Sequence, residues 1–102
     1  MKTKKYYLHA AKIFTEKKIE DDFFVLIDNG IISNITQTPS SDIPVINLGK
    51  FNLLPGFLDL HIHGREGADI MDATPEAVET ISKSLAKHGV IGFLGTTVTS
   101  TW

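Results

Sequence analysis

Two histidines stand one residue apart, at positions 61 and 63, in the stretch DLHIHGREGADIMDA. Residues two apart on a β-strand share one face, with Cα atoms about 6.5 Å apart, so the two imidazoles can converge on one point. Imidazole nitrogen is a common ligand of divalent metals and binds zinc at about 2.0–2.1 Å. The spacing leaves two interpretations open: metal ligands, or histidines that end a strand and hydrogen-bond to backbone or water.

Charged residues flank the two histidines. Asp59 falls on the same strand face, and we expect it to support an imidazole N–H from behind rather than to bind a metal directly. Arg65 and Glu66 follow His63; they fit either a group that binds a substrate anion or an ordinary exposed ion pair. The sequence has no cysteine, so any metal ligand must be His, Asp, Glu or a modified lysine. We expect no catalytic acid, base or nucleophile in this chain.

The histidines end an alternating segment, residues 57 to 63. Its apolar face consists of Leu58, Leu60 and Ile62, and its other face of Phe57, Asp59, His61 and His63. This period of two predicts a strand whose apolar face is buried. Gly64 and Gly67 fit no phosphate-binding loop, and we interpret them as flexible points in a polar loop.

A helix and a second strand follow that loop. Thr74 is suited to the N-cap, Pro75 to the first helical turn and Gly89 to the position just past the end, which predicts about four turns. The expected buried stripe is Val78, Ile81 and Leu85, and Glu79 and Lys83 form an expected surface pair. We expect Asp72 to organise the helix start. Residues 90 to 100 return to β pattern, so the segment predicts a parallel βαβ unit with the histidines at the site-forming end.

The first half of the chain reads as β-structure. Two apolar runs, 23 to 27 and 31 to 35, flank Asn29-Gly30, a strong hairpin signal. A loop rich in Pro, Ser and Asp follows, and then one or two short strands lead to Pro55-Gly56. We therefore predict a small antiparallel sheet over residues 1 to 54 and a boundary at Pro55-Gly56.

Composition restricts the function. The 102 residues are 42% hydrophobic, enough for a core, and the formal net charge of −2 gives no field that would collect nucleic acid or an anionic membrane. No run resembles a secretory signal or a membrane span, so we expect a soluble cytoplasmic protein without nucleic-acid or membrane partners.

The order of these features resembles the metal-dependent amidohydrolase superfamily. The resemblance lies in LLPGFLDLHIHG, the capped helix and HGVIGFLGTTVTS, and within the superfamily PGFLDLHIHGREGADIMDA and SLAKHGVIGFLGTTVTSTW are most similar to the N-acetylglucosamine-6-phosphate deacetylase family. The resemblance implies an α/β fold. Residues 1–54 would be an incomplete β-sandwich segment, and residues 55–102 would start a (β/α)8 TIM barrel, with strands at 57–63 and 91–100.

The same resemblance implies a function. His61 and His63 match the family's H-x-H pair and would bind a divalent ion. The complete site would hold one or two such ions, with zinc expected and iron, cobalt or manganese as alternatives. The substrate would be a small amino-sugar phosphate, hydrolysed to glucosamine 6-phosphate and acetate by a homo-oligomeric enzyme. A (β/α)8 barrel needs about 250 residues, so we predict an amino-terminal fragment that is inactive alone.

Two alternatives remain. HIHGREG also resembles the dihydroorotase and hydantoinase group, in which an arginine at the place of Arg65 holds a carboxylate. Gly64 and the lack of a proline after Glu66 depart from that pattern, and GADIMDA favours the deacetylase. The other alternative is a non-catalytic fragment that self-associates through the apolar faces of its strands and helix.

Overall fold

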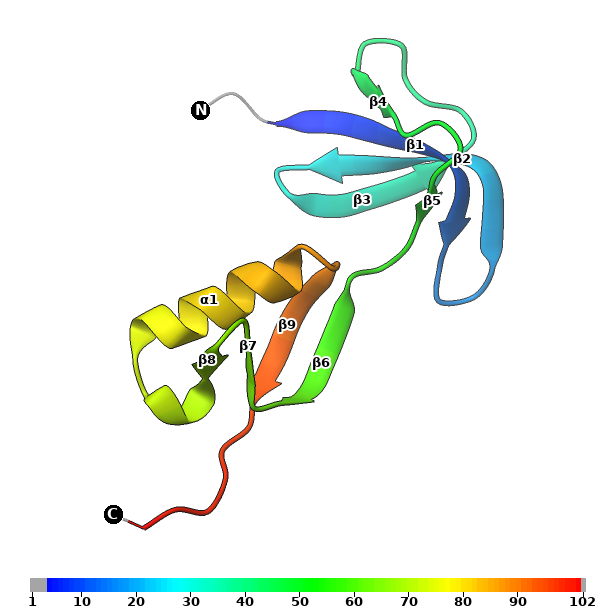
Figure 1. Ribbon diagram of the computed structural model, residues 1–102. Coiled ribbons are helices and arrows are strands. Elements are labelled where there is room, and N and C mark those ends of the chain that lie inside the picture. The colour runs from blue at the N-terminus through cyan, green and yellow to red at the C-terminus, as the bar shows by residue number, and fades with distance from the viewer. Residues whose placement is uncertain (1–3, 102) are drawn as a thin grey trace. The chain divides into compact units, whose positions relative to one another are not determined.

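The computed structural model describes residues 4–101. The chain divides into two compact units, the first ending at Pro55 and the second beginning at Gly56, and each unit is described by itself (Figure 1). The first unit contains β1 (Lys5–Phe14), β2 (Ile19–Asp28), β3 (Ile31–Thr36), β4 (Val45–Asn47) and β5 (Asn52–Leu53). The second contains β6 (Phe57–Ile62), β7 (Gly64–Arg65), β8 (Ala68–Asp69), the 3-10 turn η1 (Ile70–Asp72), α1 (Pro75–Ala86) and β9 (Val90–Gly95).

The first unit is one five-stranded sheet in the order β3-β2-β1-β4, with β5 also paired to β1. The predicted hairpin is confirmed: β2 and β3 are antiparallel, and Asn29 and Gly30 have φ of 51° and 82° in the turn between them. The predicted antiparallel pairing holds for β1, β2 and β3, but it was wrong for β4 and β5, which pair with β1 in parallel. The chain crosses from β3 to the opposite edge of the sheet, and such a crossover, unlike a hairpin, lets two strands run in the same direction.

The core of the first unit lies on one face of this sheet. Ala10, Ile13 and Val25 are buried at its centre, and the partly buried side chains packed on them are Leu8, Phe23, Ile27, Ile35, Leu48 and Leu53. The core positions in β2 alternate, as expected for a sheet that buries one face, whereas Ile13 in β1 departs from the alternation of Leu8 and Ala10.

The second unit is the predicted parallel βαβ unit. β6 and β9 pair in parallel, and α1 lies between them in the sequence (Figure 1). The second strand is shorter than predicted: β9 ends at Gly95, and residues 96–101 continue outside the ladder. The predicted polar loop contains a short antiparallel hairpin, β7 with β8, followed by η1.

The start of α1 follows its sequence signals. The Thr74 hydroxyl accepts a hydrogen bond of 3.2 Å from the backbone N–H of Ala77, and Pro75 is the first helical residue. The predicted Glu79–Lys83 pair is present, with 2.5 Å between Oε1 and Nζ. The helix has 12 residues, closer to three turns than the predicted four. Among residues 4–101, no helix combines the length and the apolar character needed to cross a membrane.

The buried stripe of α1 differs from the predicted one at one position. Ile81 and Leu85 are buried as predicted, with exposures of 0% and 3%, but Val78 is 45% exposed. Ala77 and Ser84 complete the buried face instead. The helix packs on β7, β8 and β9, and this contact selects the face around Ile81 rather than the one that includes Val78.

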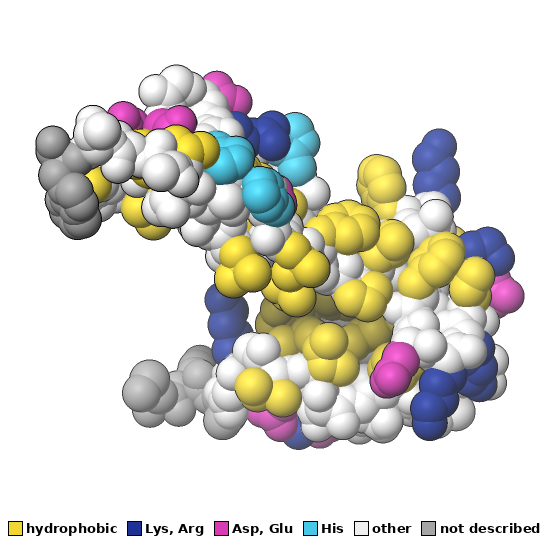
Figure 2. Space-filling view, turned by 90° about the horizontal axis from the view of Figure 1, so that it is seen from below, with side chains coloured by type: hydrophobic (Ala, Val, Ile, Leu, Met, Phe, Trp, Pro, Cys, Tyr) yellow, Lys and Arg dark blue, Asp and Glu magenta, His cyan; other side chains and the backbone are white. Residues whose placement is uncertain are grey.

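Two of the three apolar side chains of β6 are uncovered in this unit, contrary to the prediction that this face is buried, and Ile62 is half-buried. Leu58 is 66% exposed and Leu60 is 69% exposed. The reason is the position of α1, which packs over β9 and the β7–β8 hairpin. Hydrophobic side chains are widely visible on the surface in Figure 2.

Candidate metal centre

His61 and His63 point their Nε2 atoms at one another. The two nitrogens are 3.1 Å apart, and the ring planes meet at 78°. Two nitrogens that each lie about 2.0–2.1 Å from one zinc ion and have this separation subtend an angle of roughly 100° at the ion, compatible with tetrahedral coordination. The pair therefore has the spacing of two ligands of a single metal ion.

A backbone contact sets the tautomer of His63. Its Nδ1 lies 3.0 Å from the carbonyl oxygen of Thr96. Because a carbonyl oxygen only accepts hydrogen bonds, Nδ1 carries a proton, and in the neutral ring Nε2 then keeps its lone pair, which is the form that binds a metal. Without an ion, the Nε2 of His61 then donates to His63. To share an ion, His61 must carry its proton on Nδ1.

Asp59 contacts the backbone of the pair. Its Oδ1 accepts a hydrogen bond of 3.1 Å from the backbone N–H of His61, whereas the sequence led us to expect a contact with an imidazole ring. This bond holds the backbone of His61, but it does not orient the imidazole ring.

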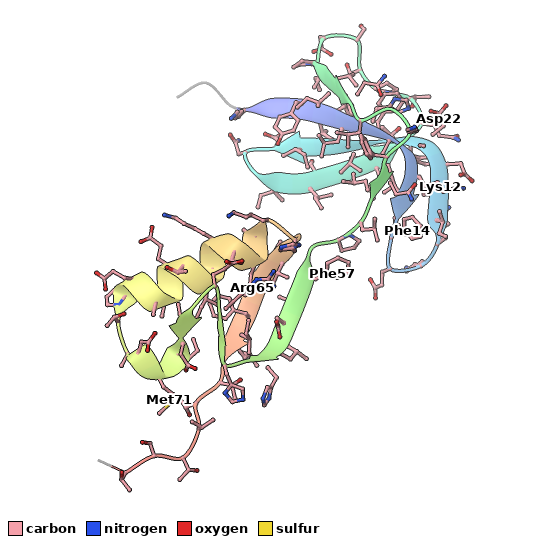
Figure 3. All side chains as sticks on the ribbon, in the orientation of Figure 1. Lys12, Phe14, Asp22, Phe57, Arg65 and Met71 are labelled. Atoms are coloured by element: carbon pink, nitrogen blue, oxygen red, sulfur yellow. The ribbon has the colours of Figure 1, made fainter. Side chains whose placement is uncertain are left out.

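Arg65 lies against α1, as Figure 3 shows. Its Nε donates a hydrogen bond of 2.6 Å to the Oγ of Ser84, which is 4% exposed, and this hydroxyl in turn lies 3.4 Å from Oε1 of Glu66. Both charged side chains that follow the histidines therefore contact one buried serine. A substrate contact by Arg65 stays a prediction.

The loop after His63 is tightly built. The carbonyl of His63 accepts a hydrogen bond of 2.7 Å from the N–H of Ile70. Asp69 and Asp72 cap η1 reciprocally, with 2.8 Å from the Asp69 N–H to the Asp72 carboxylate. Asp72 thus organises η1 and not, as predicted, the start of α1. Gly64 has a steric role that the sequence did not indicate, because a Cβ there would lie 2.2 Å from the carbonyl oxygen of Ala68.

Thr96 is the residue at this site that the sequence did not reveal. It follows β9, its N–H donates to the carbonyl of Ile62 at 2.8 Å, and its hydroxyl accepts from the Ile62 N–H at 3.2 Å. A threonine at a strand end is explained by β-propensity alone, so its type gave no signal. The position of Thr96 after the second predicted strand did give a signal, because the ends of paired parallel strands lie side by side.

The other two histidines make different contacts. His9, in the first unit, lies 2.6 Å from the carboxylate of Asp22 and stacks on Phe24 with 4.2 Å between ring centroids. His88 is exposed just after α1. In the described chain no group of three or more His, Cys, Asp or Glu side chains is arranged to hold a metal. A catalytic zinc has three protein ligands, and this pair could supply two of them.

Solved structures share this fold. The structure of a single-residue variant of N-acetyl-D-glucosamine-6-phosphate deacetylase from Mycobacterium smegmatis, in complex with N-acetyl-D-glucosamine-6-phosphate, matches with a TM-score of 0.85 and 23% identity, over 94% of this chain and 25% of that chain. A second structure of the deacetylase from M. smegmatis matches with a TM-score of 0.75 and 17% identity, over 93% of this chain and 27% of that one. No family model matches the sequence.

Sequence relatives point the same way. N-acetylglucosamine-6-phosphate deacetylase of Vibrio furnissii is 37% identical over 97% of this chain and 25% of its own length. N-acetylgalactosamine-6-phosphate deacetylase of Escherichia coli O157:H7 is 34% identical over 93% of this chain and 24% of its length. The Bacillus subtilis (strain 168) N-acetylglucosamine-6-phosphate deacetylase is 38% identical over 85% of this chain and 23% of its length.

All of these relatives belong to one class of enzyme, the deacetylases of N-acetylated amino-sugar phosphates. The chain spans about a quarter of the length of the curated relatives it matches. Within the class it corresponds to an amino-terminal fragment of N-acetylglucosamine-6-phosphate deacetylase, which confirms the resemblance carried by the motifs around the histidines.

Proposed function

We propose that this chain is the amino-terminal part of a metal-dependent hydrolase that converts N-acetylglucosamine 6-phosphate to glucosamine 6-phosphate and acetate. The observation that carries the proposal is the His61–His63 pair, with 3.1 Å between Nε2 atoms, at the end of the first of two parallel strands. Its support is the similarity to deacetylases along almost the whole chain, one of which is solved with N-acetyl-D-glucosamine-6-phosphate bound.

The residues present fit a divalent ion. His61 and His63 would hold it through Nε2, and zinc is the ion we expect, with iron, cobalt or manganese as alternatives and one or two ions in the complete site. A divalent ion there supplies Lewis-acid polarisation of the amide carbonyl and acidifies water. The chain's own part is to hold the ligands: Asp59 bonds the backbone of His61, and the Thr96 carbonyl fixes the ring of His63.

We further propose how the two units contribute to the whole enzyme. Residues 1–54 would belong to a small β-sandwich and residues 55–102 to the start of a (β/α)8 barrel. Exposure of Leu58 and Leu60 supports this, because outward-facing residues of a barrel strand are covered by helices. A barrel takes about 250 residues, so the remaining ligands and the catalytic acid or base would lie outside this chain.

The substrate suggests the compartment and the partner. A phosphate monoester carries roughly 1.5 to 2 negative charges at neutral pH, and such a charged group does not pass through a bilayer unaided. We therefore propose that the enzyme acts in the cytoplasm, on a free amino-sugar phosphate. A homo-oligomer is our expectation for its assembly.

The test is an assay of the full-length protein, prepared metal-free and reloaded with zinc, iron, cobalt or manganese. Acetate should be released from N-acetylglucosamine 6-phosphate, and the change His61→Asn with His63→Asn should abolish both turnover and the binding of the ion at this position. His88→Asn is the matched control, because this histidine is exposed and outside the site. Absence of turnover with all four metals would overturn the proposal. Turnover of a cyclic amide such as dihydroorotate instead would support the competing family.

A second candidate concerns the 102-residue chain by itself. The exposed Leu58 and Leu60 favour a non-catalytic fragment that self-associates, because contiguous apolar surface drives association. Sedimentation of the isolated chain should show oligomers, and Leu58→Ser with Leu60→Ser should shift them toward monomer, while Thr97→Ser should not. A monomeric, cooperatively melting wild-type chain would exclude this candidate.

A further inference from the structure

The backbone between the two histidines is held in an unusual way. The regular pairing of β6 with β9 is interrupted between Asp59 and Ile62. At Ile62, the residue that separates the histidines, both backbone groups bond to a single residue beyond β9. Its carbonyl accepts from the N–H of Thr96 at 2.8 Å, and its N–H donates to the Thr96 hydroxyl at 3.2 Å. A side chain therefore replaces a carbonyl in the ladder at this position.

The same residue also holds the ring of the second histidine. The carbonyl of Thr96 lies 3.0 Å from Nδ1 of His63, so one threonine contacts the chain between the ligands and one ligand directly. We propose that Thr96 is a positioning residue for the His61–His63 pair. Its hydroxyl fixes the spacing of the two imidazoles, and its carbonyl fixes the tautomer that leaves Nε2 of His63 free. This inference rests on the metal-binding function proposed above.

The chemistry of this position calls for a hydroxyl. The Thr96 Oγ1 accepts from Ile62 and donates to the carbonyl of Leu94 at 3.2 Å, so it acts as acceptor and donor at once. Valine has the same shape and can do neither, whereas serine keeps both functions. Thr97 is the natural control, because it is exposed and, within residues 4–101, its hydroxyl makes no hydrogen bond to β6.

Loss of the Thr96 hydroxyl should change the backbone at Ile62, the residue between the two histidines. The N–H of Ile62 would be left unpaired in a half-buried segment, which favours movement of the chain there. His61 would stay attached through Asp59, while His63 would move with Ile62. The separation of 3.1 Å between the Nε2 atoms, on which binding of a shared ion depends, would then no longer be maintained.

The first measurement is zinc affinity, by competition with a chromophoric chelator, in metal-free full-length protein. Thr96→Val should weaken zinc binding by about 10- to 100-fold, the usual effect of losing a partner that orients a ligand. Thr96→Ser and Thr97→Val should bind like the wild type. If valine prevents folding, Thr96→Ala removes the same hydroxyl with less bulk and carries the same expectation.

The second measurement needs no metal. NMR of the ring nitrogens should show His63 of the wild type only with its proton on Nδ1, and a mixture of tautomers in Thr96→Val. A valine variant that keeps both the zinc affinity and the single tautomer would overturn the inference. If the wild type binds no zinc, the proposed metal site fails, and the tautomer measurement still decides whether Thr96 holds His63.

Discussion

The Nε of Arg65 donates a hydrogen bond of 2.6 Å to the Oγ of Ser84 on the buried face of α1. This contact ties the hairpin that follows the histidines to the helix that covers it, and Glu66 shares the same hydroxyl. Ser84 is 4% exposed, so the bond is shielded from water and its loss leaves a charged donor without its partner. Arg65, the candidate for a substrate contact, is thus a structural link.

Removing the hydroxyl should cost stability. We expect Ser84→Ala to lower the free energy of unfolding by about 1–3 kcal/mol, the range for a hydrogen bond to a charged group or for a buried polar group left unpaired. Chemical denaturation measures this, with Ser82→Ala, on the exposed side of the same helix, as the control. Kinetics of the full-length protein separate the two roles of Arg65. In Arg65→Lys, a raised KM at unchanged stability would show a substrate contact, and reduced stability at unchanged KM would show a structural link.

The local elements of this protein are predictable from the sequence because their causes are local. Asn29-Gly30 adopts positive φ at both positions, and Thr74-Pro75 starts a helix, through contacts within a few residues. The alternation that ends at His61 and His63 likewise gives their shared face without knowledge of the rest of the chain.

The parts that were missed depend on distant partners. The parallel pairing of β4 with β1 joins residues far apart in the sequence, and nothing in the short run Val45–Asn47 specifies its direction. Val78 fits the apolar stripe of a helix but is exposed, because the elements that pack on α1 lie on another side. The contact of His63 with Thr96 uses a backbone carbonyl, which every residue type possesses, so no residue pattern could indicate it.

The N-cap of α1 offers a second prediction. Thr74→Ala removes the acceptor of the Ala77 N–H and should lower the free energy of unfolding by about 1 kcal/mol. Thr80→Ala is the matched control, because the Thr80 hydroxyl bonds a carbonyl within the helix, where it is not needed for capping. Equal losses in both variants, measured by chemical denaturation, would argue against a specific cap.

A third prediction concerns pH. The hydrogen bond and the charge of Lys83 hold the pKa of Glu79 below its ordinary value. A carboxyl with a lowered folded-state pKa contributes stability above its ordinary pKa and loses it as the pH falls through the lowered one. Both side chains are exposed, so the effect is small and weakens in salt.

The measurement is a double-mutant cycle of Glu79→Gln and Lys83→Met by thermal melting at low salt. A favourable coupling should appear near neutral pH and vanish in acid, once Glu79 is protonated. A coupling that is the same in acid would mean that contacts other than the ion pair join the two side chains.

Gly64 gives the last prediction, because the chain turns there directly after the second histidine. A Cβ at this position would lie 2.2 Å from the carbonyl oxygen of Ala68 and 2.9 Å from Cα of Asp69, both backbone atoms that cannot move alone. Gly64→Ala should therefore push the β7–β8 hairpin open, at about 1–3 kcal/mol of stability, and displace His63, whose carbonyl bonds Ile70 in the same loop.

Gly67 separates this steric effect from backbone strain. It has φ of +77° in the hairpin turn with open space around it, so Gly67→Asn, a residue that tolerates this conformation, should change little. Denaturation and zinc titration of both variants test the difference. If Gly64→Ala retains the stability and the zinc affinity of Gly67→Asn, close approach of the backbone at Gly64 is not what places His63.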